Sequence, residues 1–195
     1  EVRKADNKPE EALALWKKLS DEDIFGYYGM IALHQQNLPL RKITEASGLA
    51  RGLAEKDDEL FRALQTVEEW DLASRFLGSV LPDTASLKKA PGADIASIVK
   101  LYAEVKNYKY IFGLFNQLPF ETQRDVFEKV PSVLFPQPYP ESIAKAAQAA
   151  NIEPELIYSI MRQESSFDPN ARSPMDALGL TQVLPEVAKK IASET

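Results

Sequence analysis

The chain has no cysteine and a single histidine, His34. The absence of cysteine excludes disulfide bonds, thiolate metal ligands and a cysteine nucleophile. One histidine cannot build a multi-histidine metal site and argues against a Ser-His-Asp triad. We therefore predict no metal site and no cofactor. His34 follows the apolar run 30–33, so we expect a hydrogen-bonded structural residue there.

The chain also lacks an excess of basic residues and any long apolar run. Its 23 Lys and Arg are outnumbered by 29 Asp and Glu, for a net charge of −6, which argues against nucleic-acid binding. No apolar run approaches the roughly 20 residues of a transmembrane helix. The chain begins at Glu1 without an initiator methionine or signal peptide, so we expect a processed or trimmed product.

Helical periodicity dominates the sequence, and no stretch shows the alternation typical of β-strands. The apolar stripes are short and are interrupted by Pro39, Pro82, Pro91 and Pro119. This pattern predicts an all-α fold, with an irregular α-superhelical, solenoid-like array over residues 1–130. The stripes expected to face the core are Ala12, Leu15, Trp16 and Leu19; Ile24, Tyr27, Tyr28 and Ile31; Leu60, Leu64 and Val67; Leu72, Phe76 and Val80; Ile98, Leu101, Tyr102 and Val105; Ile111, Leu114, Phe115 and Leu118; and Val126, Phe127 and Val130.

Residues 131–140 form the clearest break in the periodicity. Prolines stand at four of these ten positions, and such a density cannot continue a helix and favours extended backbone. We predict a linker over 131–140 and a second helical module over 141–195, which begins with a stripe on Ile143, Ala146, Ala147 and Ala150.

Glu164 is the leading candidate for a chemical role. The spacing predicts a helix over 154–165, in which Leu156, Ile157, Ile160 and Met161 form an apolar arc that includes Glu164. A carboxyl group on an apolar face is desolvated, which raises its pKa and suits it to general acid catalysis near neutral pH. The alternative is a helix-end glutamate that reaches solvent or pairs with a nearby cation.

The residues after Glu164 resemble the catalytic domain of the soluble lytic murein transglycosylases, a lysozyme-like family that cleaves peptidoglycan. Three motifs carry the resemblance: Glu164-Ser165 at a helix end, Ser173-Pro174 after it, and the Gly-Leu-x-Gln-x-x-Pro segment over 179–185. The close match covers residues 139–192. It implies that residues 141–195 are the first part of a lysozyme-like α domain, truncated at its C-terminal side. The segment 25–33 faintly resembles the superhelical region of the larger members.

The sequence departs from the family pattern at three points. Thr181 stands where the family usually has Met, and Asp176 where it usually has Gly. Asp tolerates unusual backbone angles better than most residues. The family's third motif, Ala-Tyr-Asn-Ala-Gly, does not occur before Thr195, so we expect this fragment to be much slower than a full-length protein.

The resemblance implies a peptidoglycan lytic transglycosylase in the periplasm or cell envelope that cleaves glycan strands between N-acetylmuramic acid and N-acetylglucosamine. Glu164 would act as acid and then as base, leaving a 1,6-anhydro end. Ser173, Thr181 and Gln182 match groove residues that contact the substrate, although Ser173 is equally a turn residue. A paired-carboxylate mechanism would need a second carboxylate, for which Asp168 and Asp176 are candidates by proximity in sequence, but both lie among turn-forming residues. The competing interpretations are hydrolysis to a reducing sugar and a helical scaffold or glycan-binding module without catalysis.

Overall fold

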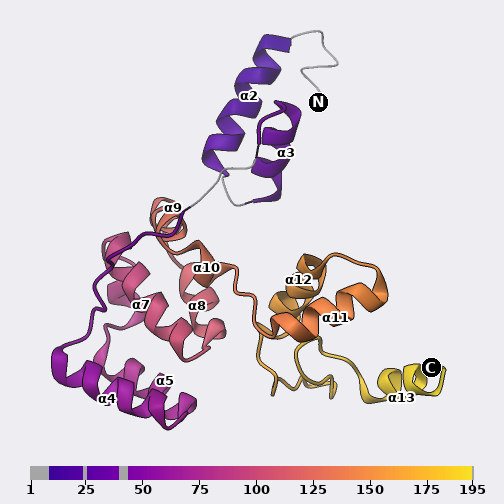
Figure 1. The fold of residues 1–195 in the computed structure, drawn as a ribbon. Helices are drawn as coiled ribbons and strands as arrows, with labels where there is room; N and C mark the ends of the chain where they lie inside the picture. Colours follow the sequence, from indigo (N-terminus) through magenta and orange to yellow (C-terminus); the bar gives the residue numbers. More distant parts are fainter. Residues whose placement is uncertain (1–8, 24–25, 40–43, 195) are drawn as a thin grey trace. The chain divides into compact units, whose positions relative to one another are not determined.

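The computed structural model describes residues 9–23, 26–39 and 44–194, and within these ranges the chain is helical and has no strand (Figure 1). The predicted all-α fold is confirmed. The chain divides into two compact units, Glu1–Thr44 and Glu45–Thr195. The helices are α2 (Pro9–Glu22), α3 (Tyr27–Gln35), α4 (Glu55–Thr66), α5 (Trp70–Val80), α6 (Thr84–Leu87), α7 (Gly92–Glu104), α8 (Tyr108–Phe115), α9 (Phe120–Lys129), α10 (Pro131–Leu134), α11 (Pro140–Ala150), α12 (Pro154–Ser165) and α13 (Pro185–Glu194).

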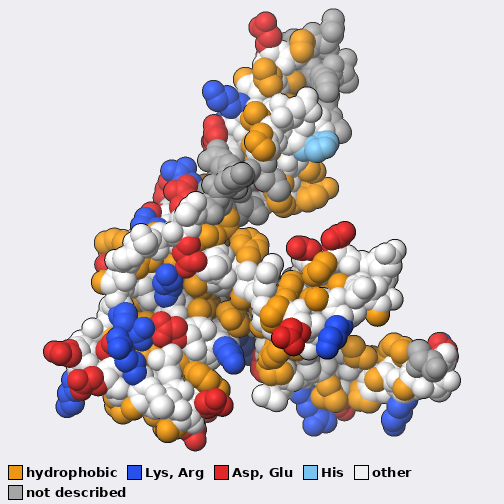
Figure 2. Space-filling view, in the orientation of Figure 1, with side chains coloured by type: hydrophobic (Ala, Val, Ile, Leu, Met, Phe, Trp, Pro, Cys, Tyr) orange, Lys and Arg blue, Asp and Glu red, His pale blue; other side chains and the backbone are white. Residues whose placement is uncertain are grey.

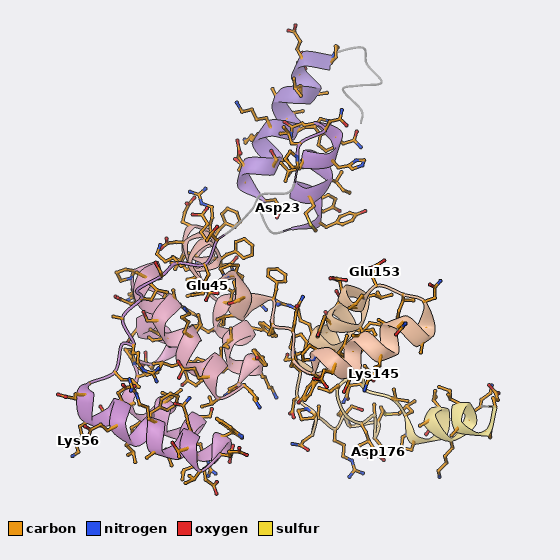
Figure 3. The ribbon with its side chains drawn as sticks, in the orientation of Figure 1. Asp23, Glu45, Lys56, Lys145, Glu153 and Asp176 are labelled. Atoms are coloured by element: carbon orange, nitrogen blue, oxygen red, sulfur yellow. The ribbon has the colours of Figure 1, made fainter. Side chains whose placement is uncertain are left out.

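The first unit is a helical hairpin in which α2 packs against α3. The Asp23 side chain, labelled in Figure 3, accepts a hydrogen bond of 2.9 Å from the Gly29 N–H. A Cβ at residue 29 would overlap the Asp23 carbonyl oxygen, so this approach requires glycine.

Several core predictions for this hairpin are wrong. Tyr27 and Tyr28 are exposed and meet each other edge to face at 5.4 Å, and His34 is exposed rather than packed. A two-helix unit has little interior, and Ala12, Ala32 and Leu33 occupy it. The predicted stripe residue Ile24 lies outside the described ranges.

In the second unit, α4 to α10 form a helical array with α7 at its centre. Helix α7 packs against α5, α8, α9 and α10. The stripes predicted for α7, α8 and α9 supply most of this core. Its largest fully buried side chains include Ile95, Val99, Leu101, Ile111, Leu114, Val126 and Val130.

The stripes predicted for α4 and α5 are wrong in register. Leu60, Val67 and Leu72 are exposed, whereas Phe61 and Leu77 are fully buried. Helix α4 packs chiefly on α5 and reaches α7 through the Gln65–Glu104 hydrogen bond, so only a narrow strip of α4 is covered. When the contact is narrow, either side of an apolar stripe can be the buried one, and helical periodicity alone does not predict which.

The proline-rich segment joins the array to the last helices. Pro131 and Pro140 each stand in the first turn of a helix, where proline needs no hydrogen-bond partner for its nitrogen. Helix α10 ends at Leu134, residues 136–138 have no regular secondary structure, and Tyr139 is left-handed with φ of 58°. Residues 45–194 form one compact unit, and the domain division at 131–140 stays a prediction.

Candidate active site

Helix α12 has the predicted bounds, Pro154–Ser165, and it places Glu164 in its last turn. Ser166 follows in the left-handed conformation, with φ of 53°. Its N–H donates to the Arg162 carbonyl at 3.2 Å, and the Phe167 N–H donates to the Met161 carbonyl at 3.3 Å. These bonds close the helix C-terminus at a left-handed residue. The helix therefore stops immediately after the Glu-Ser pair.

The expected burial of Glu164 is not found, because its side chain is exposed. Within the apolar arc, Met161 is 1% exposed, but Leu156 and Ile160 are 51% and 41% exposed. Helix α11 packs against α12, and Glu164, Ile160 and Leu156 stay exposed to solvent. Hydrophobic side chains accordingly reach the surface over α12 and α13 (Figure 2).

Arg162 anchors the opposite side of the same helix, a role the sequence did not reveal. Two residues along a helix turn the direction by about 160°, so Arg162 and Glu164 point to nearly opposite faces. The guanidinium lies 3.9 Å from the Phe112 ring centroid and 5.4 Å from that of Phe135, and Nη1 donates to the Leu134 carbonyl. Burial lowers the pKa of Arg162, which nevertheless stays charged.

Phe167 adds a second anchor beside Arg162. It is 5% exposed and packs against Tyr108 at 5.6 Å and Phe112 at 6.2 Å between ring centroids. The sequence signals for both anchors were weak, since Arg162 falls on the polar side of the helical wheel and Phe167 follows the helix end. Together they fix the C-terminal turn of α12, and with it Glu164, to α8 and α10.

The Ser165 hydroxyl joins the helix end to the Gly-Leu-Thr-Gln segment. Its Oγ lies 3.1 Å from the Met161 carbonyl and 2.9 Å from the Leu180 carbonyl. Ser165 therefore bonds backbone, as its position at the helix end indicates. This contact brings the first and third sequence motifs together beside Glu164.

The Gln182 side chain stabilises the same loop by hydrogen bonds to its backbone. Its Nε2 donates to the Ala171 carbonyl at 3.1 Å and to the Gly179 carbonyl at 2.9 Å. Its backbone is left-handed, with φ of 48°. Both amide protons are thus committed to the protein, and only Oε1 is left to meet a ligand. The sequence identified the residue but not this internal role.

Ser173 and Thr181, the other predicted substrate-binding residues, differ in exposure. The Ser173 Oγ accepts from the Met175 N–H at 3.2 Å and the Ala177 N–H at 3.0 Å, which is the geometry of a turn residue. Thr181 is exposed at the loop tip. Their contact with a substrate stays a prediction.

The two nearby aspartates have structural partners. Asp168 accepts a hydrogen bond from the Asn170 N–H at 2.8 Å, and Asp176 accepts from Arg172 at 2.7 Å. Asp176 has φ of 61°, the unusual backbone angle for which Asp is suited. Over the described part of the chain, no three His, Asp or Glu side chains are grouped to hold a metal ion. None of the described helices is long and apolar enough to cross a membrane.

Comparison with known proteins finds a family match for the last part of the chain. Residues 141–195 match the family described as Transglycosylase SLT domain. A membrane-bound lytic murein transglycosylase C from Haemophilus influenzae is 52% identical over 46 residues, which cover 24% of this chain and 13% of that protein.

Two solved structures resemble almost the whole chain. An inactive mutant of the lytic transglycosylase Slt from Pseudomonas aeruginosa superposes with a TM-score of 0.68 at 19% identity, over 99% of this chain and 30% of that one. The 70-kDa soluble lytic transglycosylase from Escherichia coli gives 0.62 at 18% identity, over 99% and 29%. The chain thus spans under a third of these relatives. Residues 141–195 carry the sequence of a transglycosylase SLT domain, and the described helices have the fold of the soluble lytic transglycosylases.

Proposed function

We propose that this chain is part of a peptidoglycan lytic transglycosylase with Glu164 as its catalytic acid and base. It cleaves the β-1,4 bond between N-acetylmuramic acid and N-acetylglucosamine and leaves a 1,6-anhydro end. Its partner is the glycan strand, it needs no cofactor, and it works in the periplasm or cell envelope.

One observation carries the proposal: the Ser165–Leu180 hydrogen bond of 2.9 Å, which holds the Glu164 helix end against the Gly-Leu-Thr-Gln loop. The segment that forms this contact is also the one that matches the SLT domain. The exposed face of α12 beside the loop gives a glycan direct access to Glu164.

The reaction needs one carboxyl group in two roles. Protonated Glu164 gives its proton to the glycosidic oxygen as the bond to the muramyl C1 breaks, and the substrate's acetamido oxygen stabilises the cation at C1. The Glu164 carboxylate then takes the proton of the muramyl 6-hydroxyl as that oxygen bonds to C1. The proton returns to Glu164, and no water is consumed.

Glu164 must hold a proton for the first step, which desolvation favours. No described residue covers it, so the bound glycan supplies the covering surface in this proposal, against Leu156 and Ile160. Thr181 lies at the exposed loop tip and contacts the sugar there, Gln182 presents its remaining Oε1, and Ser173 shapes the turn beside them.

The second candidate is a helical scaffold or glycan-binding module without catalysis. The exposure of Glu164 and the internal use of both Gln182 amide protons favour it. Hydrolysis to a reducing sugar is a third outcome, which differs only in whether water reaches C1.

Mass spectrometry of sacculi digested by the full-length protein separates the three. Anhydromuramyl ends are the result we expect. Reducing ends would mean hydrolysis, and unchanged glycan that still binds the protein would mean a scaffold.

A further inference from the structure

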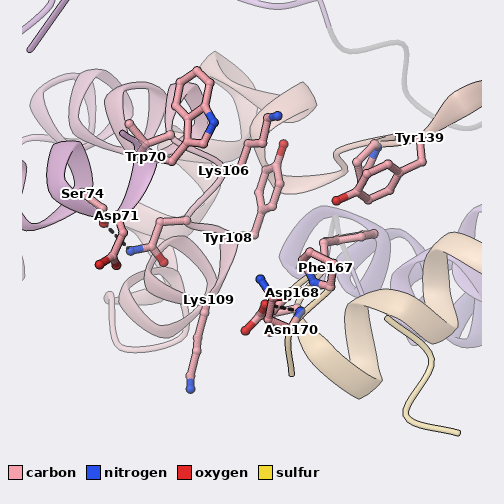
Figure 4. A pocket seen from close by; sticks show the side chains of 15 residues that line it. Trp70, Asp71, Ser74, Lys106, Tyr108, Lys109, Tyr139, Phe167, Asp168 and Asn170 are labelled. Carbon is pink, nitrogen blue, oxygen red and sulfur yellow. Dashed lines mark hydrogen bonds between the residues drawn. The ribbon is translucent and has the colours of Figure 1, made fainter. Parts of the chain in front are cut away.

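A groove of about 680 Å³ lies on the side of the second unit where α5, the α7–α8 turn and the loop after α12 meet (Figure 4). Trp70 begins α5, Lys106 and Tyr108 flank the turn, Tyr139 precedes α11, and Asp168 belongs to the loop. Glu164 does not line this groove, and the proposed reaction does not use it.

Aromatic side chains form the walls of the groove. Tyr139 is 43% exposed, and Trp70 and Tyr108 are half-buried. Phe112 and Phe167 support Tyr108 at ring-centroid distances of 6.3 Å and 5.6 Å, so its ring is fixed. Burial raises the pKa of Tyr108 and the neighbouring Tyr139 adds to the shift, so its hydroxyl remains a donor. Rigid aromatic faces with polar edges suit the alternating C–H and O–H surfaces of sugar rings.

Four residues with left-handed backbone lie at the groove. Lys106, Tyr139, Ser166 and Phe167 all line the groove, and all have φ between 53° and 65°. Lys106 and Ser166 adopt this conformation at the C-terminal ends of α7 and α12, where left-handed residues are common, and Tyr139 adopts it immediately before α11.

Charges of both signs line the groove: Lys106 and Lys109 are positive, and Asp71 and Asp168 are negative. Lys106 Nζ sits 5.2 Å from the centroid of the Trp70 ring, and Lys109 is exposed. Among the residues described, no carboxylate pairs with either lysine, whereas Asp71 pairs with Arg75 at 2.5 Å and Asp168 accepts from its own loop. The two lysines are therefore available to bind carboxylates of a ligand.

We propose that this groove is a second glycan site, separate from Glu164, for an oligosaccharide that carries carboxylate groups. Resting on the proposed function, the ligand is a further stretch of the murein strand with its peptide stems. A second contact on one polymer raises the affinity for long strands without altering the reacting group.

The test uses the full-length protein with two background substitutions. Glu164→Gln blocks cleavage during binding, and Trp16→Phe leaves Trp70 as the one tryptophan of residues 1–195. The probe is the disaccharide tetrapeptide released from sacculi by a muramidase, and the neutral comparison is chitotetraose. Calorimetry gives the Kd, and Trp70 fluorescence reports the site. The disaccharide tetrapeptide should bind saturably, change the Trp70 emission, and bind more tightly than chitotetraose.

Tyr139→Ala and Lys109→Glu should each raise that Kd about tenfold or more, equivalent to 1.4 kcal/mol or more. Tyr28→Ala and Lys88→Glu remove the same residue types from exposed positions outside the groove and should leave the Kd unchanged. Circular dichroism checks that every variant is folded. Three results would overturn the proposal. These are titrations without any saturable heat or fluorescence change, a Kd for chitotetraose equal to that for the disaccharide tetrapeptide, and an equal rise of the Kd in the control variants. None of these results depends on whether Glu164 is the acid, which the cleavage assay reads separately.

Discussion

Arg162 is the residue whose replacement should most clearly separate anchoring of α12 from the chemistry of Glu164. Its guanidinium stacks on Phe112 at 3.9 Å and donates to the Leu134 carbonyl. Arg162→Met keeps most of the apolar volume but removes both contacts and leaves that carbonyl without its donor.

The expected loss follows from the two contacts. A desolvated cation–π pair contributes about 2 kcal/mol, and a hydrogen bond from a charged donor about 1.5–3 kcal/mol. Since the two share one side chain and are not additive, we expect the free energy of unfolding to fall by about 2–4 kcal/mol. Arg162→Lys keeps the charge but loses the planar stack, and it should fall between wild type and Arg162→Met.

Urea denaturation of the second unit, followed by far-ultraviolet circular dichroism, measures the change. Arg172→Met is the matched control, because Arg172 pairs with Asp176 at an exposed site and should contribute less than about 1 kcal/mol. A loss for Arg162→Met no larger than that of Arg172→Met would refute the anchoring role.

Three further predictions concern other contacts. Gln182→Ala removes two hydrogen-bond donors from the loop and should destabilise the loop by about 1–3 kcal/mol. The expected result is faster amide hydrogen exchange at Leu178 and Val183, and unchanged exchange would leave Gln182 as a substrate contact only. Gly29→Ala forces a Cβ against the Asp23 carbonyl oxygen and should lower the stability of the hairpin by about 1–3 kcal/mol. Faster proteolysis within α2 and α3 measures this loss, and Gly113→Ala, whose Cβ would meet no neighbour, is the control that should be tolerated. The hydrogen bond from Ser132 and the nearby Lys100 lower the pKa of Glu45 in the folded protein. Ionised Glu45 therefore stabilises the fold above the ordinary Glu pKa of about 4.3, and this contribution is lost as pH falls through the lower pKa of the folded state. Ser132→Ala should therefore flatten the acid limb of the stability curve, and an unaltered limb would exclude this contact as its cause.

The sequence predicted best where local chemistry decides the outcome. Pro154 suits the first turn of a helix through its backbone preference, and the predicted bounds of α12 are confirmed. The stripes on α7 to α9 were correct because those helices are covered broadly, so most apolar residues on them are buried.

The misses came from long-range packing. Which edge of α4 is covered depends on its single main neighbour, which the local pattern does not encode. Arg162 lies on the polar face of α12, yet Phe112 and Phe135, distant in sequence, surround its guanidinium, and the local pattern does not encode that contact. Glu164 was expected to be buried because its neighbours on the helix are apolar, but burial requires a partner surface, and the described residues provide none.

The most direct test of the central proposal is the rate of anhydromuropeptide release from purified sacculi by full-length wild type and Glu164→Gln. Gln is nearly isosteric with Glu but cannot deliver a proton, and positioned acid–base catalysis contributes about 10²–10⁴-fold in rate. We expect a loss of at least that size, with the unfolding curve and sacculus binding unchanged. If Glu164→Gln kept more than about a tenth of the wild-type rate, well short of that range, Glu164 would not be the acid and the scaffold interpretation would stand in its place.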